Sequence, residues 1–183
     1  MKADVDIRAH IDADAHLQRE INHALSATAE GLAMTGDLRL VRILARTLGP
    51  SWTEHVSFQE EVIFPIAASR HGGSTKKSIA LLRADHDNLS HQHTEIGSVL
   101  QGLLDGRPTD LDQLGTTLRA TMALRRSHFL LDAELHTSLP APYTTKERSF
   151  CIHWMRTRPP ARFPLSLLRE GGHSIPRGPG RVH

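Results

Sequence analysis

The sequence predicts an all-α protein, an up-down-up-down antiparallel four-helix bundle followed by an irregular basic C-terminal tail. Three observations indicate this fold class. Apolar residues before position 140 recur at spacings of three and four, the period of an amphipathic helix. Glycine and proline breakers divide this region into four segments joined by short loops, as antiparallel neighbours require. Aromatic residues make up only 4% of the chain, so Leu, Ile, Val and Ala must fill the core.

The first two segments are long and each ends at a breaker. The first helix is expected over about Val5–Met34, where a Thr-Gly-Asp sequence stops it. The second is expected over about Leu38–Ser69. Its Gly49-Pro50 pair should kink or interrupt it, because proline removes one intrahelical hydrogen bond and collides with the preceding turn.

The third and fourth segments begin with residues that favour helix N-termini. Ser74 or Thr75 can cap the third helix, which ends at an Asp-Gly-Arg-Pro sequence. Thr109 or Asp110 can cap the fourth, which extends to about Leu139.

Charge and proline content change near Pro140, which indicates a bundle over residues 1–140 and a loosely ordered tail over 141–183. The tail holds six of the ten prolines and eight Lys/Arg against two acidic residues, so it carries +6 and the bundle −4. Residues 150–155 are apolar enough to dock on the bundle or on a partner. Arginines mixed with aromatic residues suggest nucleic-acid contact, and the alternative is a basic extension lying on the acidic bundle.

Cysteine content and hydropathy limit the compartment and the kind of site. Cys151 is the only cysteine, which excludes an intramolecular disulfide framework and any multi-cysteine zinc or iron-sulfur site. The N-terminus lacks a signal pattern, and no apolar run approaches the roughly 20 residues that a bilayer span needs. We therefore expect a soluble cytoplasmic protein with no membrane partner.

Histidines provide the chemical signal in this chain. There are thirteen, and four of them lie about one helix length apart, at matching depths in an antiparallel bundle. These four are His16, His55, His86 and His128. His55 is followed four residues later by Gln59, and His128 by Asp132, which places each pair on one helical face. Donors at that spacing suit a metal ion inside a bundle.

This ordered set resembles the hemerythrin-like, or HHE cation-binding, family over about residues 10–140. That family has a histidine on its first and third helices and a His-x3-Glu on its second and fourth, often followed by a Leu-Phe-Pro-like ending, as at Phe64-Pro65 and Leu139-Pro140 here. The resemblance implies a non-haem iron protein, possibly diiron, with a coordination position open to O2, NO or peroxide. The implied metal ligands are His16, His55, Gln59, His86, His128 and Asp132.

Two positions depart from the family pattern and leave alternatives open. Gln59 stands where a bridging glutamate is usual, and its neutral amide cannot bridge two metals, so one iron or a zinc ion is an alternative to a diiron centre. Asp132 is one methylene shorter than glutamate but keeps an anionic oxygen. Glu60 replaces Gln59 as a ligand only if the helix rotates.

Two other functions remain open beside metal binding. One is a metal-poor helical module for regulation or protein interaction, whose site has decayed at Gln59. The other is a repair enzyme for damaged iron-sulfur clusters, which ranks last because the chain lacks the N-terminal cysteine-bearing region of such proteins. We expect binding rather than catalysis.

Overall fold

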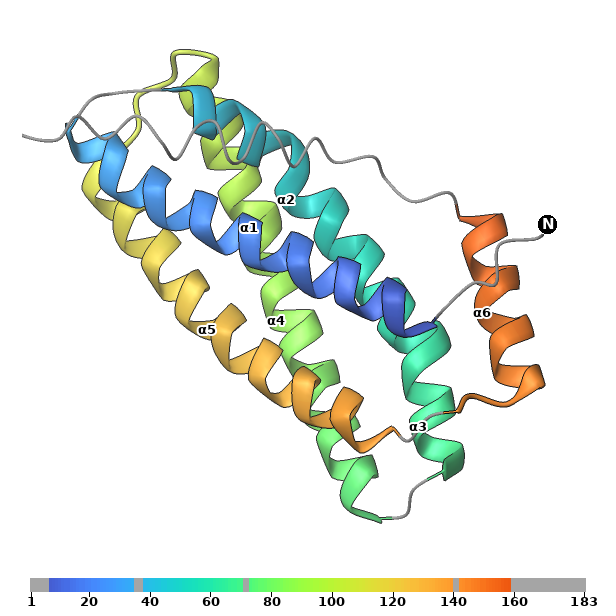
Figure 1. Cartoon of the computed structure of the whole chain (residues 1–183). Coiled ribbons are helices and arrows are strands. Elements are labelled where there is room, and N and C mark those ends of the chain that lie inside the picture. Colours follow the sequence, from blue (N-terminus) through green and yellow to red (C-terminus); the bar gives the residue numbers. More distant parts are fainter. Residues whose placement is uncertain (1–6, 35–37, 71–72, 140–141, 159–183) are drawn as a thin grey trace, which may run out of the picture.

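The computed structural model describes residues 7–34, 38–70, 73–139 and 142–158 (Figure 1). All regular secondary structure in these ranges is helical, which confirms the all-α prediction. Four long helices lie side by side, and three shorter helical segments complete the fold. The long helices are α1 (Ile7–Met34), α2 (Leu38–Phe58), α4 (Gly73–Leu104) and α5 (Leu111–Ser138). The others are the π-helical segment η1 (Gln59–Ile63), α3 (Phe64–Arg70) and α6 (Thr145–Thr157).

The four long helices contact one another in a closed ring. α1 packs against α2 and α5, and α4 packs against the same two helices. Two apolar clusters fill the space inside. One cluster includes Ile21, Leu25, Leu44, Leu100 and Leu118. The other includes Ile11, Phe58, Val62, Leu82 and Leu135, with residues of α6.

Between the two clusters each long helix contributes buried polar side chains, which we call the polar layer. It comprises Gln18, Ser51, His55, Gln59, His86, His93, Arg125, His128, Asp132 and His136. Burying a polar group costs free energy unless it is hydrogen-bonded, and most residues of this layer hydrogen-bond to neighbouring side chains. Among the helices described, none combines the length and the apolar character of a membrane span.

The interruption in the second predicted helix lies at a different place from the one expected. Pro50 is inside α2, and the α-helix continues through it to Phe58. The change of helical type comes nine residues later, at η1, where the Phe64 N–H donates to the Gln59 carbonyl. A π-turn inserts one residue into the helix and rotates the residues after it by about 100°.

The predicted N-terminal cap agrees with the structure at α5 and differs from it at α4. Asp110 caps α5, because its carboxylate accepts a hydrogen bond from the Gln113 N–H at 2.9 Å. Ser74 and Thr75 do not precede α4, which begins at Gly73.

The expectation of an irregular chain from residue 141 onward is wrong for residues 145–157, which form α6. Thr144 and Glu147 make a capping box, a helix-start signal that the proline count had obscured. Cys151 and Trp154 are buried in the same cluster as Phe58, which confirms docking of the apolar stretch 150–155 on the bundle. Residues 159–183, with most of the tail arginines that raised nucleic-acid contact as a possible role of the tail, lie outside the described ranges.

An ion pair between Arg70 and Glu147 ties α3 to α6, with Arg70 Nε 2.7 Å from Glu147 Oε1. The hydrogen bond from Arg70 lowers the pKa of Glu147 to about 2. The folded state therefore gains stability above the ordinary value of 4.5, and this gain is lost as the pH falls towards about 2.

We predict that Glu147→Gln lowers the free energy of unfolding at neutral pH by about 1–2 kcal/mol, because it removes a charge-assisted hydrogen bond. Glutamine retains the capacity for the capping box. Urea unfolding across the pH range should show the variant and the parent converging in acid. The exposed Glu134→Gln serves as the control, and a difference between variant and parent that is independent of pH would contradict the role given to the ion pair.

Candidate metal centre

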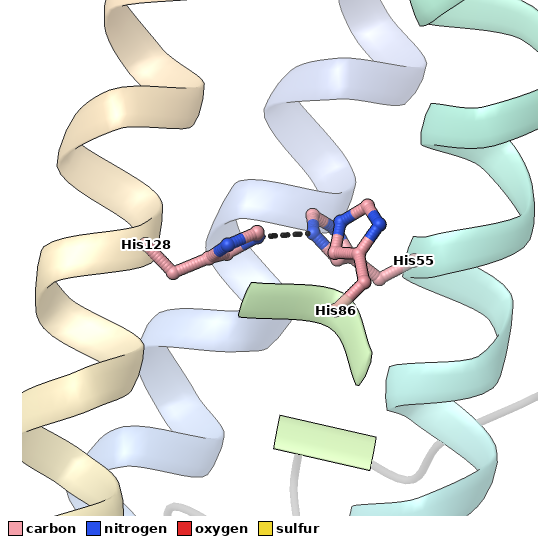
Figure 2. Close-up of side chains that lie close together, drawn as sticks. All are labelled: His55, His86 and His128. Carbon is pink, nitrogen blue, oxygen red and sulfur yellow. Dashed lines mark hydrogen bonds between the residues drawn. The ribbon is translucent and has the colours of Figure 1, made fainter. Parts of the chain in front are cut away.

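Three histidines from three helices meet in the polar layer (Figure 2). His55 comes from α2, His86 from α4 and His128 from α5, and all three are buried. One ring nitrogen of each lies within 4.8 Å of the corresponding nitrogens of the other two. The Nε2 atoms of His55 and His128 are 3.1 Å apart, which is hydrogen-bonding distance.

The second ring nitrogen of each histidine faces a carboxylate. The pairs are His55 Nδ1 with Asp14 Oδ2 at 2.6 Å, His86 Nδ1 with Glu60 Oε1 at 3.2 Å, and His128 Nδ1 with Asp85 Oδ2 at 3.5 Å. At His55 and His86 the carboxylate is hydrogen-bonded to Nδ1, which holds a proton there and leaves the Nε2 lone pair on the opposite side of the ring, whereas Nδ1 of His128 has no hydrogen-bond partner among the described residues. His86 Nε2 is accordingly buried with no hydrogen-bond partner among the described residues.

The three rings differ in their affinity for protons. Burial lowers the pKa of His86 to about 4 and that of His128 to about 2, so both are neutral near pH 7. Burial also acts to lower the pKa of His55, but the charge and hydrogen bond of Asp14 outweigh it and raise that pKa. Whichever ring donates in the 3.1 Å contact, one proton lies between Nε2 of His55 and Nε2 of His128.

The first two residues of η1 contact different long helices. Gln59 is buried, and its Nε2 lies 2.9 Å from Nε2 of His136 on α5. Glu60 reaches α4, where its carboxylate contacts His86 and also accepts a hydrogen bond from Arg83 at 2.9 Å. Glu60 therefore acts as the outer partner of a histidine and is not one of the converging donors.

Gln59, Asp132 and His136 form a second polar group beside the three imidazoles. Asp132 Oδ1 lies 3.3 Å from His136 Nε2 but has no hydrogen-bond partner within the described ranges, and the same holds for Gln59 Oε1. Burial raises the pKa of Asp132 to about 7, although nearby His55 opposes this. Asp132 contributes no atom to the group formed by the converging ring nitrogens of His55, His86 and His128.

Arg125, one turn before His128, is fully buried within the polar layer. It donates to Gln18 Oε1 at 2.7 Å, to Asn22 Oδ1 at 2.6 Å and to His93 Nε2 at 3.0 Å. These acceptors are neutral, and burial lowers the pKa of Arg125 to about 9. The contact with Arg125 places His93 in the hydrogen-bond network that surrounds the three histidines.

His16, the predicted ligand on the first helix, does not join the three histidines. Asp14 supplies the α1 side chain that reaches His55. Two residues correspond to about 200° around a helix, so Asp14 and His16 lie on nearly opposite faces. The polar residues of α5 that the sequence analysis overlooked, Arg125 and His136, share a helical stripe with His128, and this spacing was a usable signal.

The donor set fits a single transition-metal ion. Three imidazole nitrogens converge in a buried site, with the rings of His55 and His86 oriented by carboxylates at Nδ1, and imidazole ligands suit zinc, iron and copper. A carboxylate-bridged pair of ions fits less well, because Gln59 contacts His136 and Asp132 lies outside the group. Comparison of the chain with models of known protein families, with curated proteins and with solved structures finds no match.

We predict that Asp14→Asn lowers the pKa of His55, because it removes the charge that outweighs burial. The imidazole 15N signals of the full chain, followed by NMR during a pH titration, measure this shift directly. Asp12→Asn, on an exposed position of the same helix, should leave the signal of His55 unchanged. An unaltered His55 titration in Asp14→Asn would show that the 2.6 Å contact does not control the ring.

Proposed function

We propose that this protein binds a transition-metal ion, iron or zinc, through the Nε2 atoms of His55, His86 and His128. The observation that carries this proposal is the convergence of three buried ring nitrogens within 4.8 Å. The carboxylates hydrogen-bonded to Nδ1 of His55 and His86 support it, since metal-bound histidines almost always donate their second N–H to such a partner. A cluster of three imidazoles that only supports the fold gains little from having its ring nitrogens turned towards one another.

The surrounding residues would orient the donors and keep the site dry. Trp52 packs against the rings of His55, His86 and His128, with centroids 5.1–5.8 Å away. Phe129 contacts two of these rings. Binding of a cation requires the proton shared by His55 and His128 to leave, so protons compete with the metal.

We further propose that the chain is a hemerythrin-like protein with up-down-up-down antiparallel topology, and that it senses, stores or scavenges O2 or NO. The ring of contacts among the four long helices supports this topology. Bound iron would supply a redox-active centre with a coordination position that no protein donor fills. Gln59 and the position of Asp132 favour one ion over two.

The second candidate is a metal-free bundle that serves as a regulatory or interaction module. The 3.1 Å contact between His55 and His128 favours it, because this hydrogen bond satisfies two of the three nitrogens without an ion. Elemental analysis separates the two functions.

We predict about one metal ion per chain in protein purified from iron- and zinc-supplemented medium. His128→Ala should weaken binding about 100-fold or more, since it removes a donor where loss of an outer partner alone costs 10–100-fold. Elemental analysis and calorimetric titration provide the measurements. His91→Ala, at an exposed position of α4, is the matched control. A metal content near zero in the parent protein would support the metal-free candidate, and two ions per chain would refute the mononuclear site.

We predict that Gln59→Glu raises iron affinity and stoichiometry, because it places an anionic oxygen beside Asp132. Without metal the same variant should unfold at a lower temperature than the parent, since a second buried carboxylate is repelled by the first. Added iron should reverse that difference. If iron neither binds more tightly nor stabilises the variant, position 59 supplies no metal ligand and the group of Gln59, Asp132 and His136 takes no part in a metal site.

A further inference from the structure

A pocket of about 390 Å³ lies between α1 and α5, next to the polar layer and open to solvent. These two helices run side by side in Figure 1. The buried part of its lining consists of Gln18, Asp132 and His136. The volume falls in the range of small-molecule sites, which combine apolar walls with a few polar groups.

The exposed part of the lining is cationic. Arg19 comes from α1 and Arg126 from α5, and neither has a carboxylate partner among the described residues. Phe129 and Leu130 supply apolar wall between the exposed arginines and the buried polar residues. Two unpaired guanidinium groups attract an anion and can bind a carboxylate through several N–H donors.

The buried part of the pocket contains an unsatisfied polar atom. Asp132 is 5% exposed, and its Oδ1 lacks a hydrogen-bond partner in the part of the chain that the structure describes. Leaving such an atom unpaired costs free energy that a ligand can recover. A hydroxyl group suits this position in either protonation state of Asp132, because a hydroxyl both donates and accepts.

We propose that this pocket binds a small hydroxylated organic anion. Its carboxylate contacts Arg19 and Arg126, its apolar body lies against Phe129, and its hydroxyl reaches Asp132. Asp132 lies six positions after Arg126 on α5, which corresponds to about 9 Å of helical rise. A single aromatic ring with substituents at opposite ends can span this distance. The site is complete without metal and does not depend on the proposed metal function.

The pocket also communicates with the three histidines through Gln18. The amide of Gln18 accepts from Arg125 and donates to Asp14 Oδ1 at 3.1 Å, and the other oxygen of Asp14 contacts His55. A ligand that contacts Gln18 or Asp132 therefore perturbs side chains that lie one hydrogen bond away from the candidate metal ligands.

The test uses 4-hydroxybenzoate with the metal-free full chain, followed by calorimetry and backbone NMR. We expect saturable binding with shifts concentrated at residues 15–22 and 126–136. Arg19→Gln/Arg126→Gln should weaken binding about tenfold or more, because it removes two charge-assisted contacts. Benzoate, which lacks the hydroxyl, should bind roughly fivefold more weakly, as expected for one lost hydrogen bond.

Arg42→Gln, an exposed arginine on α2 outside the pocket, is the matched control and should bind as the parent does. The substituted arginines are all exposed, so these variants should fold. Absence of saturable binding, shifts confined to other helices, equal affinity in the double variant, or equal affinity for benzoate would each overturn the proposal. A metal content of zero would leave it standing, which separates it from the proposed function.

Discussion

Desolvation of the polar layer is the constraint on which the rest of this structure depends. Four helices bury imidazoles, amides, a carboxylate and a guanidinium between two apolar clusters. Such groups cost free energy wherever their hydrogen bonds are left incomplete. The partners therefore follow from burial: Asp14 for His55, Glu60 for His86, and neutral acceptors around Arg125. The apolar clusters contribute the stability that allows this layer to remain buried.

The π-turn changes the register of the second helix beside the polar layer. Gln59 and Glu60, at its start, contact α5 and α4 respectively. One residue is inserted, and the apolar residues Val62 and Ile63 at its end lie in the core. Insertions of this kind are frequent at functional sites, because they redirect a few side chains without ending the helix.

Local patterns in the sequence predicted the helical fold and part of the site. The apolar period located the four long helices, and the common depth of His55, His86 and His128 predicted that they meet. The apolar spacing could not show whether His16 or Asp14 faces the other helices, because packing decides how the first helix is rotated about its axis. The π-turn has no local signal, since it depends on contacts with α4 and α5. Composition obscured α6, although Thr144 and Glu147 carried its start signal.

The two tryptophans of the chain occupy separate environments. Trp52 contacts four imidazoles in the polar layer, with its ring centroid 4.9 Å from that of His93, whereas Trp154 packs on Phe58 at 5.2 Å. Because protonated imidazole quenches indole fluorescence, emission from Trp52 follows the charge state of the centre. Emission from Trp154 follows detachment of α6. The molecule thus carries two built-in optical reporters, one for its interior and one for the docking of α6.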